Sequence, residues 1–91
     1  MSALKLPDTL LHDQAEACLA QWVAHLRLHP QSAVTVDASA LLEFDSSALA
    51  VLLGFRRVVL AQGGILHVAD MTARLRELAS LYGVLDLLQP A

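Results

Sequence analysis

Apolar residues recur along the chain at two spacings, and each spacing predicts a type of element. Between Asp13 and Leu28 they fall three or four positions apart, which places them on one face of a helix. Over residues 33–37, apolar and polar side chains alternate and several are branched at Cβ. We therefore expect a helix followed by a strand, with Val34 and Val36 on the core side of the strand. The helical face comprises Ala15, Cys18, Leu19, Trp22, Val23 and Leu26.

A second helix is predicted to begin at Asp45-Ser46-Ser47. The side-chain oxygens of Asp and Ser accept hydrogen bonds from the free amides of a first helical turn. The helix continues over Ala48 to Ala61, and Gly63-Gly64 supplies the residues of positive φ that end helices. Residues 65–69 form a short apolar run that predicts a further strand.

Capping signals also bound a third helix. Thr72 can accept the first free amide and Gly83 can end the helix. Residues 84–88 are apolar and fit either a strand or one helical turn. The predicted inner face of the third helix is Leu75, Leu78, Ala79 and Tyr82.

The remaining segments complete an alternating order of elements. Residues 1–6 are expected to supply a short edge strand that stops at Pro7, which lacks the amide a ladder needs. Residues 37–45 are expected to form a loop. The order is then strand, helix, strand, helix, strand, helix with short links, which predicts one α/β domain over residues 1–91 with helices packed on a largely parallel sheet.

The second predicted helix is apolar around its whole circumference between Ala48 and Phe55. Such a helix needs cover on all sides, whereas a helix lying on a sheet buries only about half of itself. We therefore expect the flank of Ala50, Val51, Gly54 and Phe55 to face a partner protein, unless the loops and the third helix cover it.

Composition supports a protein partner over a membrane or a nucleic acid. Of the 91 residues 56% are hydrophobic and only 16% are charged. A membrane-spanning helix needs about 20 mostly apolar residues. The longest stretch without Asp, Glu, Lys or Arg, Val58 to Ala69, is shorter and is broken by Gln62-Gly63-Gly64. The net charge is −3 and the basic residues are scattered, so no basic stripe is offered to a phosphate backbone.

Two further features predict a cytoplasmic chain. Cys18 is the one cysteine and cannot form an internal disulfide, and residues 1–8 have no apolar core of signal-peptide length.

The candidate chemical groups do not make up an enzyme. Ser46 and Ser47 lie where a helix N-terminus stabilises an anion, including a phosphate carried on a serine, although spacing alone favours plain N-capping. Neither serine lies in a G-x-S-x-G elbow, and His67 has no acid partner that the sequence reveals. His25 and His29 stand four residues apart but lack a third metal ligand. We expect no catalysis, no cofactor and no metal.

Three segments together resemble the STAS domain, the module of sulfate transporters and anti-sigma factor antagonists. They are Val34-Thr35-Val36-Asp37 through Phe44-Asp45-Ser46-Ser47-Ala48-Leu49-Ala50-Val51-Leu52-Leu53, then Ala61-Gln62-Gly63-Gly64-Ile65-Leu66, and Leu75-Arg76-Glu77-Leu78. The centre of the resemblance is the D-S-S-x-L motif from Asp45 to Leu49. The resemblance implies a STAS-like mixed, largely parallel sheet of four to five strands, with three to four helices packed mainly on one side, and it implies no catalysis.

In the anti-sigma antagonists, a serine of this motif is phosphorylated by a partner kinase that is itself the anti-sigma factor. The resemblance carries that role to Ser46, directly after Asp45, and in second place to Ser47. Those antagonists have glycine after the two hydroxyl residues, whereas this chain has Ala48.

The short length and the ending from Leu75 to Val84 are more similar to the MlaB branch of the family. Its members are small cytoplasmic subunits of a bacterial phospholipid-trafficking ABC transporter, in which the hydroxyl-bearing motif and its helix bind the ATPase. This resemblance implies a chain at the inner face of the cytoplasmic membrane through its partner. The expected contact residues are Asp45, Ser46, Ser47, Leu49, Ala50, Leu53 and Phe55, with Arg56 and Arg57 at the rim.

Overall fold

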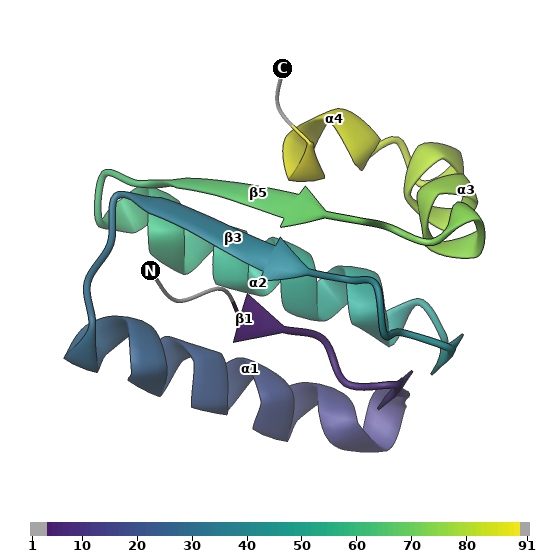
Figure 1. The fold of residues 1–91 in the computed structure, drawn as a ribbon, viewed down its shortest axis with the longest axis horizontal. Coiled ribbons are helices and arrows are strands. Elements are labelled where there is room, and N and C mark those ends of the chain that lie inside the picture. The colour runs from purple at the N-terminus through teal and green to yellow at the C-terminus, as the bar shows by residue number, and fades with distance from the viewer. Residues whose placement is uncertain (1–3, 90–91) are drawn as a thin grey trace.

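The computed structural model describes residues 4–89, in which strands and helices alternate (Figure 1). The two five-residue strands and the three longer helices follow the predicted order of elements. The order is β1 (Leu4–Lys5), β2 (Thr9–Leu10), α1 (His12–Leu28), β3 (Ala33–Asp37), β4 (Glu43–Phe44), α2 (Ser47–Ala61), β5 (Ile65–Ala69), α3 (Ala73–Leu81) and α4 (Leu85–Leu88).

The described strands pair in parallel, which confirms the predicted α/β class. One sheet has the order β1-β3-β5, with Leu4 opposite Val36 and Val36 opposite Val68. Helices α1 and α2 connect its strands, as parallel neighbours require. The other two strands, β2 and β4, form a separate small sheet. Pro7 explains this division, because a residue without an amide interrupts the N-terminal strand.

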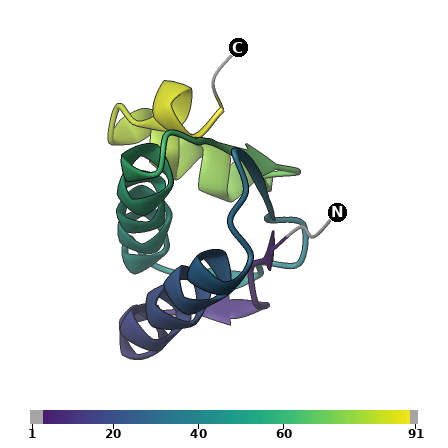
Figure 2. The ribbon, with the colours of Figure 1, turned by 90° about the vertical axis from the view of Figure 1, so that its left-hand side faces the viewer.

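The layers follow from the alternation of side chains along the strands. Helices α1 and α2 lie on one face of the three-stranded sheet, and α3 and α4 lie beside its β5 edge (Figure 2). Val34 and Val36 of β3 are buried toward the helices, as predicted, and Leu66 and Val68 of β5 are buried with them. The intervening residue His67 is exposed on the other face.

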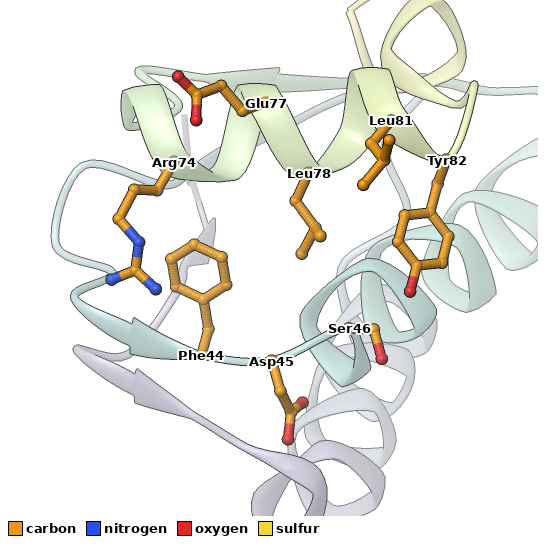
Figure 3. A pocket seen from close by; sticks show the side chains of 8 residues that line it. All are labelled: Phe44, Asp45, Ser46, Arg74, Glu77, Leu78, Leu81 and Tyr82. Carbon is orange, nitrogen blue, oxygen red and sulfur yellow. The ribbon is translucent and has the colours of Figure 1, made fainter.

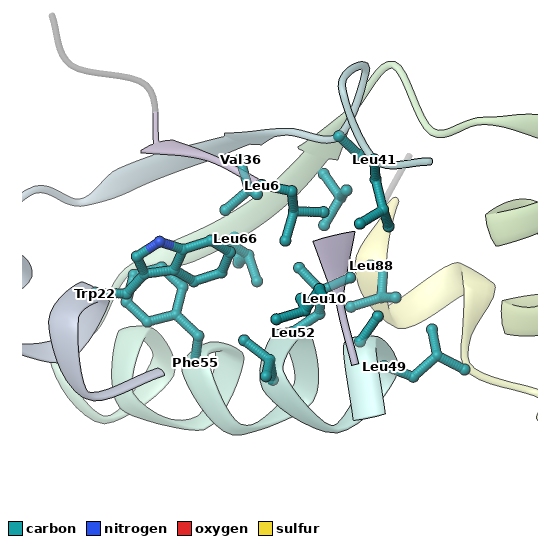
Figure 4. Packing of buried hydrophobic residues seen from close by; sticks show 14 of the residues in the cluster. Leu6, Leu10, Trp22, Val36, Leu41, Leu49, Leu52, Phe55, Leu66 and Leu88 are labelled. Atoms are coloured by element: carbon teal, nitrogen blue, oxygen red, sulfur yellow. The ribbon is translucent and has the colours of Figure 1, made fainter. Parts of the chain in front are cut away.

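The main core lies between this sheet and the two helices (Figure 4). The rings of Trp22 on α1 and Phe55 on α2 meet edge to face, with their centroids 5.2 Å apart. A Cβ added to Gly54 would lie 3.1 Å from a methyl carbon of Leu19, so the missing side chain lets α1 approach α2 closely. Helix α1 therefore covers one flank of the apolar α2.

Two local expectations need revision, and one open alternative is decided. Residues 37–45 are more than a loop, since β4 forms within them. The ambiguous segment 84–88 contains the helical turn α4. Tyr82 is 58% exposed, so its predicted place on the inner face of α3 is wrong. Tyr82 follows the last residue of α3, where helical spacing no longer fixes the direction of a side chain. Residues 1–3 of the predicted first strand lie outside the described part.

Within residues 4–89, none of the helices is both long enough and apolar enough to cross a bilayer.

Candidate functional site

A hollow of about 480 Å³ lies between α3 and the segment that joins β4 to α2 (Figure 3). Its floor includes Asp45 and Ser46 of the predicted motif. Leu78 and Phe44 point into it from opposite sides, and Tyr82 closes one end. The fold thus joins the D-S-S motif to residues that lie between 28 and 36 positions after Ser46. The lining residues are Phe44, Asp45, Ser46, Arg74, Glu77, Leu78, Leu81 and Tyr82.

The carboxylate of Asp45 connects the first turns of two helices. Its Oδ1 accepts the amide of Ser47 at the start of α2, with a donor–acceptor distance of 2.8 Å. Its Oδ2 accepts the amide of His12 at the start of α1, at 3.2 Å. Free amides at a helix N-terminus need such acceptors. Asp45 therefore does the capping predicted for the motif, whereas Ser46 makes no side-chain capping bond.

These hydrogen bonds change the protonation of Asp45. The Ser47 amide, which stabilises the ionised form, holds the pKa of the Asp45 carboxyl below its usual value, and the His12 amide acts in the same direction. Asp45 is thus an anion held between two helix N-termini at neutral pH.

The two serines of the motif differ in their surroundings. Ser46 is exposed at the edge of the hollow. Ser47 is half-buried, and its hydroxyl lies 3.5 Å from Nδ1 of His12. The carboxylate of Asp45 accepts the backbone amide of His12 and not its ring, so the three residues do not form the hydrogen-bond relay of a hydrolytic triad.

The other wall of the hollow comes from α3 and the residue that follows it. Leu81 is 81% exposed and Tyr82 is 58% exposed. At the opposite end, the guanidinium carbon of Arg74 lies 5.1 Å from the centroid of the Phe44 ring, within the range of a cation–π contact. The hollow therefore offers apolar and aromatic surface to the solvent next to the polar start of α2.

The structure separates the predicted contact residues into two groups. Leu49 and Phe55 are 3% and 0% exposed and belong to this chain's own core. Much of the flank that is expected to face a partner is covered by α1, because Trp22 packs on Phe55 and Leu19 packs near Gly54, while Ala50 stays exposed. The accessible predicted residues are Asp45, Ser46, Ala50 and Arg57, with Ser47, Leu53 and Arg56 half-buried.

Sequence reasoning missed the α3 wall of the hollow. Leu81 lies outside the predicted inner face of the third helix and has no predicted role, whereas Tyr82 is predicted to lie on that inner face. One signal in the sequence is Gly83, which ends the helix and adopts φ = 73°. Residues beside such a stop leave the helical face, so two large apolar residues directly before it have no assured place in the core.

The remaining candidates form no site. Among residues 4–89, no three His, Cys, Asp or Glu side chains gather closely enough to hold a metal ion. The rings of His25 and His29 lie 4.9 Å apart, and Nε2 of His25 is buried without a hydrogen-bond partner. The thiol of Cys18 is buried, and this burial raises its pKa. A thiol in such surroundings is a weak nucleophile.

A comparison with protein families finds one match for the whole described chain. The family model described as "Mlab, STAS domain" matches residues 1–89. A comparison with curated proteins finds no match.

Proposed function

We propose that this chain, which belongs to the STAS domain family in its MlaB form, is a non-enzymatic subunit that binds and supports the ATPase of a bacterial phospholipid-transport ABC transporter. Its work would then be done at the inner face of the cytoplasmic membrane, which it reaches through its partner. The observation that carries this proposal is the hollow in which the D-S-S motif meets the exposed Leu81 and Tyr82.

The composition of the hollow favours a protein partner. Aromatic residues and Arg are enriched at protein interfaces, and residues at their centre lose water on binding. Tyr82, Phe44 and Arg74 supply these residue types around one concavity. Single exposed apolar side chains are common elsewhere on the surface, but Leu81 and Tyr82 are exposed side by side at one concavity, which a docking surface accounts for.

The same geometry supports a role without catalysis. The Ser47 hydroxyl and the His12 ring are near each other, but no side-chain carboxylate orients the ring in the described structure. A nucleophile needs an oriented base. STAS domains are generally not enzymes.

A pair of matched variants tests the proposal. Leu81→Ser removes an exposed apolar side chain from the hollow, and Leu28→Ser removes one that is 77% exposed at the end of α1. Each variant would be mixed with the purified ATPase of a phospholipid-transport ABC transporter from the same organism, and complex formation would be measured by size-exclusion chromatography and ATP turnover. We expect Leu81→Ser to lose the complex and Leu28→Ser to retain it.

Equal loss in both variants, or an unaltered complex in both, would contradict the assignment of the hollow. Failure of the wild-type chain to bind the ATPase would refute the function itself.

A second candidate, an anti-sigma factor antagonist switched by phosphorylation, is favoured by the accessibility of Ser46. This hydroxyl is exposed at the N-terminus of α2, where a kinase can reach it and where the helix stabilises a phosphate. Incubation with cellular kinases and ATP, followed by mass spectrometry, tests it. Stoichiometric phosphate on Ser46 or Ser47 would support the antagonist, and an unmodified protein supports the transporter subunit.

A further inference from the structure

A second concavity lies at the free edge of the three-stranded sheet, between β1 and α1. Its volume is about 530 Å³, and it shares none of its lining residues with the hollow at α3. It is lined by residues of the segment 5–9 and by residues of α1 from Asp13 to Trp22. The strand order β1-β3-β5 leaves β1 without a neighbouring strand on this side within residues 4–89. We call this concavity the β1 groove.

The strand side of the β1 groove offers unpaired backbone groups. The amide of Leu6 donates to the carbonyl oxygen of Asp37, the last residue of β3, at 2.9 Å. Successive residues of a strand direct their N–H and C=O groups to opposite edges, so those of Lys5 are directed to the free edge. An extended segment that lies along this edge can therefore exchange hydrogen bonds with Lys5, as in recognition by strand addition.

The floor of the β1 groove is apolar but contains one donor without an acceptor. Leu6, Trp22 and Cys18 are 1%, 6% and 9% exposed. No hydrogen bond within residues 4–89 uses the indole N–H of Trp22. Figure 4 shows the nitrogen on the ring edge that faces away from Phe55. Because a buried Trp usually gives this N–H a partner, the open donor favours an occupant with a carbonyl or carboxylate oxygen at this end of the groove.

The two ends of the β1 groove carry opposite charge. Helix α1 runs opposite to β1 along the groove, so Lys5 lies toward Trp22 and away from Asp13 (Figure 1). Lys5 and Asp13 are both exposed. One end thus has a cation beside the indole donor, and the other end has an anion. A complementary occupant has an acidic group opposite Lys5 and a basic group opposite Asp13.

We infer that the β1 groove binds an extended peptide segment of another protein, about five residues long, with an acidic residue at one end and a basic residue at the other. Asp13 and Trp22 are separated by about 14 Å along α1. About four steps of an extended chain cover the same distance. The segment pairs its backbone with Lys5 and places an apolar side chain over Cys18. Binding at this groove is independent of the hollow and of the ATPase.

Two pools of capped pentapeptides test the inference on the full-length chain. One pool has Glu at one end and Arg at the other, in either order, around three mixed apolar residues, and the second pool has Gln at both ends. Binding would be followed by the fluorescence of Trp22, the one tryptophan of the chain, and by amide chemical shifts in NMR spectra. We expect the charged pool to shift the amides of residues 5–9 and 13–22. It should bind about fivefold more tightly than the Gln pool, as for two exposed charge pairs.

Variants of both molecules separate the charge from the backbone pairing. Lys5→Glu should lose the preference for the charged pool. Arg27→Glu makes the same change of charge at an exposed position of α1 outside the groove, so binding should stay within about twofold. Circular dichroism checks that both variants fold. A charged pool whose three middle residues are N-methylated keeps its side chains but loses backbone donors, and it should bind at least about threefold more weakly.

Several results would overturn the inference. They are absence of binding by both pools, equal binding of the two pools, shifts that map to the hollow, and undiminished binding of the N-methylated peptides. Shifts of residues 4–6 that depend on protein concentration without any peptide would also overturn it, because the β1 edge then pairs with a second copy of the chain. The proposed function is unaffected by each of these results, since it depends on the hollow and the ATPase.

Discussion

At the scale of the residue, Asp45 has the largest structural role in the motif. One carboxylate accepts the first free amide of α1 and of α2 and so fixes the relative position of two helix N-termini. It also places Ser46 at the edge of the hollow. The two serines are the candidate functional groups in the sequence. Asp45, directly before them, fixes the position of the helix start that carries them.

The protonation of Asp45 leads to a pH-dependent prediction. Because its pKa is lowered in the folded chain, the stabilisation is present above the ordinary Asp pKa and is lost as the pH falls through the folded value. We expect the thermal midpoint of Asp45→Ala to lie below that of the wild type at pH 7, and the difference to shrink below about pH 4.

Thermal unfolding followed by circular dichroism at several pH values measures this difference. Asp45→Asn is the control, since it keeps an acceptor but cannot titrate, and its difference from Asp45→Ala should not depend on acid in this range. A wild-type advantage that persists unchanged at pH 3 would contradict the role of the ionised carboxylate.

Gly64 is a second residue whose role is visible only in three dimensions. A Cβ at this position would lie 2.8 Å from the carbonyl oxygen of Ser32 and 3.1 Å from a methyl carbon of Val59. The carbonyl belongs to the backbone next to β3 and cannot move freely. We expect Gly64→Ala to cost about 1–3 kcal/mol of unfolding free energy, the range for overpacking.

Urea denaturation of Gly64→Ala and Gly54→Ala provides the comparison. The Cβ of Gly54→Ala would meet only the flexible end of Leu19, and alanine gains helix propensity over glycine. The loss at Gly54 should therefore be the smaller one. Equal losses at the two positions would show that backbone crowding at Gly64 is not the cause.

At the scale of the element, the sequence predicts the bounds of those strands and helices that are defined by a regular spacing of apolar residues. The strands β3 and β5 have the predicted bounds, because each is a run of alternating burial with turn signals on both sides. Helix α2 begins and ends close to its predicted limits, because Asp45 caps its first turn and Gly63 follows its end with φ = 80°. The pair β2 and β4 could not be predicted in this way, since two-residue strands have no period and exist through their mutual pairing.

The cover of α2 was the other element that spacing could not predict. An apolar circumference shows that the helix must be covered but does not show by what. The close approach of α1 at Gly54 supplies most of the cover from within the chain. Exposed side chains on α2 remain at Ala50, Arg57 and Leu60, so less of the helix is left for a partner than the sequence predicts.

The N-cap of α3 stabilises the helix that forms one wall of the hollow, and its contribution can be measured. The Oγ1 of Thr72 accepts the amide of Leu75 at 3.3 Å, and the helix ends at the exposed Leu81. We expect Thr72→Ala to cost about 1 kcal/mol of stability, the usual value of a lost N-cap, and Thr72→Ser to cost much less. Urea denaturation measures both; a Thr72→Ser chain as unstable as Thr72→Ala would show that the methyl group and not the hydroxyl matters.

At the scale of the whole molecule, the many hydrophobic side chains fall into a buried group and an exposed group. Most of it fills one continuous core on the helix-covered side of the three-stranded sheet and beneath α4. A smaller part remains outside, and around the hollow it is concentrated in Leu81 and Tyr82. The two parts have different consequences, since core residues determine stability and surface residues determine association.

Alanine variants of Phe55 and Leu81 distinguish the effect of a core residue on stability from the effect of a surface residue on binding. Phe55 is fully buried against Trp22, so Phe55→Ala should cost about 3–5 kcal/mol, a large part of the total stability of a small domain. Leu81→Ala removes an exposed side chain and should change stability by less than about 0.5 kcal/mol. Urea denaturation followed by Trp22 fluorescence gives the stability, and titration with the ATPase gives the affinity. Weak binding by the stable Leu81→Ala chain identifies a contact, whereas a stability loss at Leu81 equal to that at Phe55 would place Leu81 in the core and remove it from the interface.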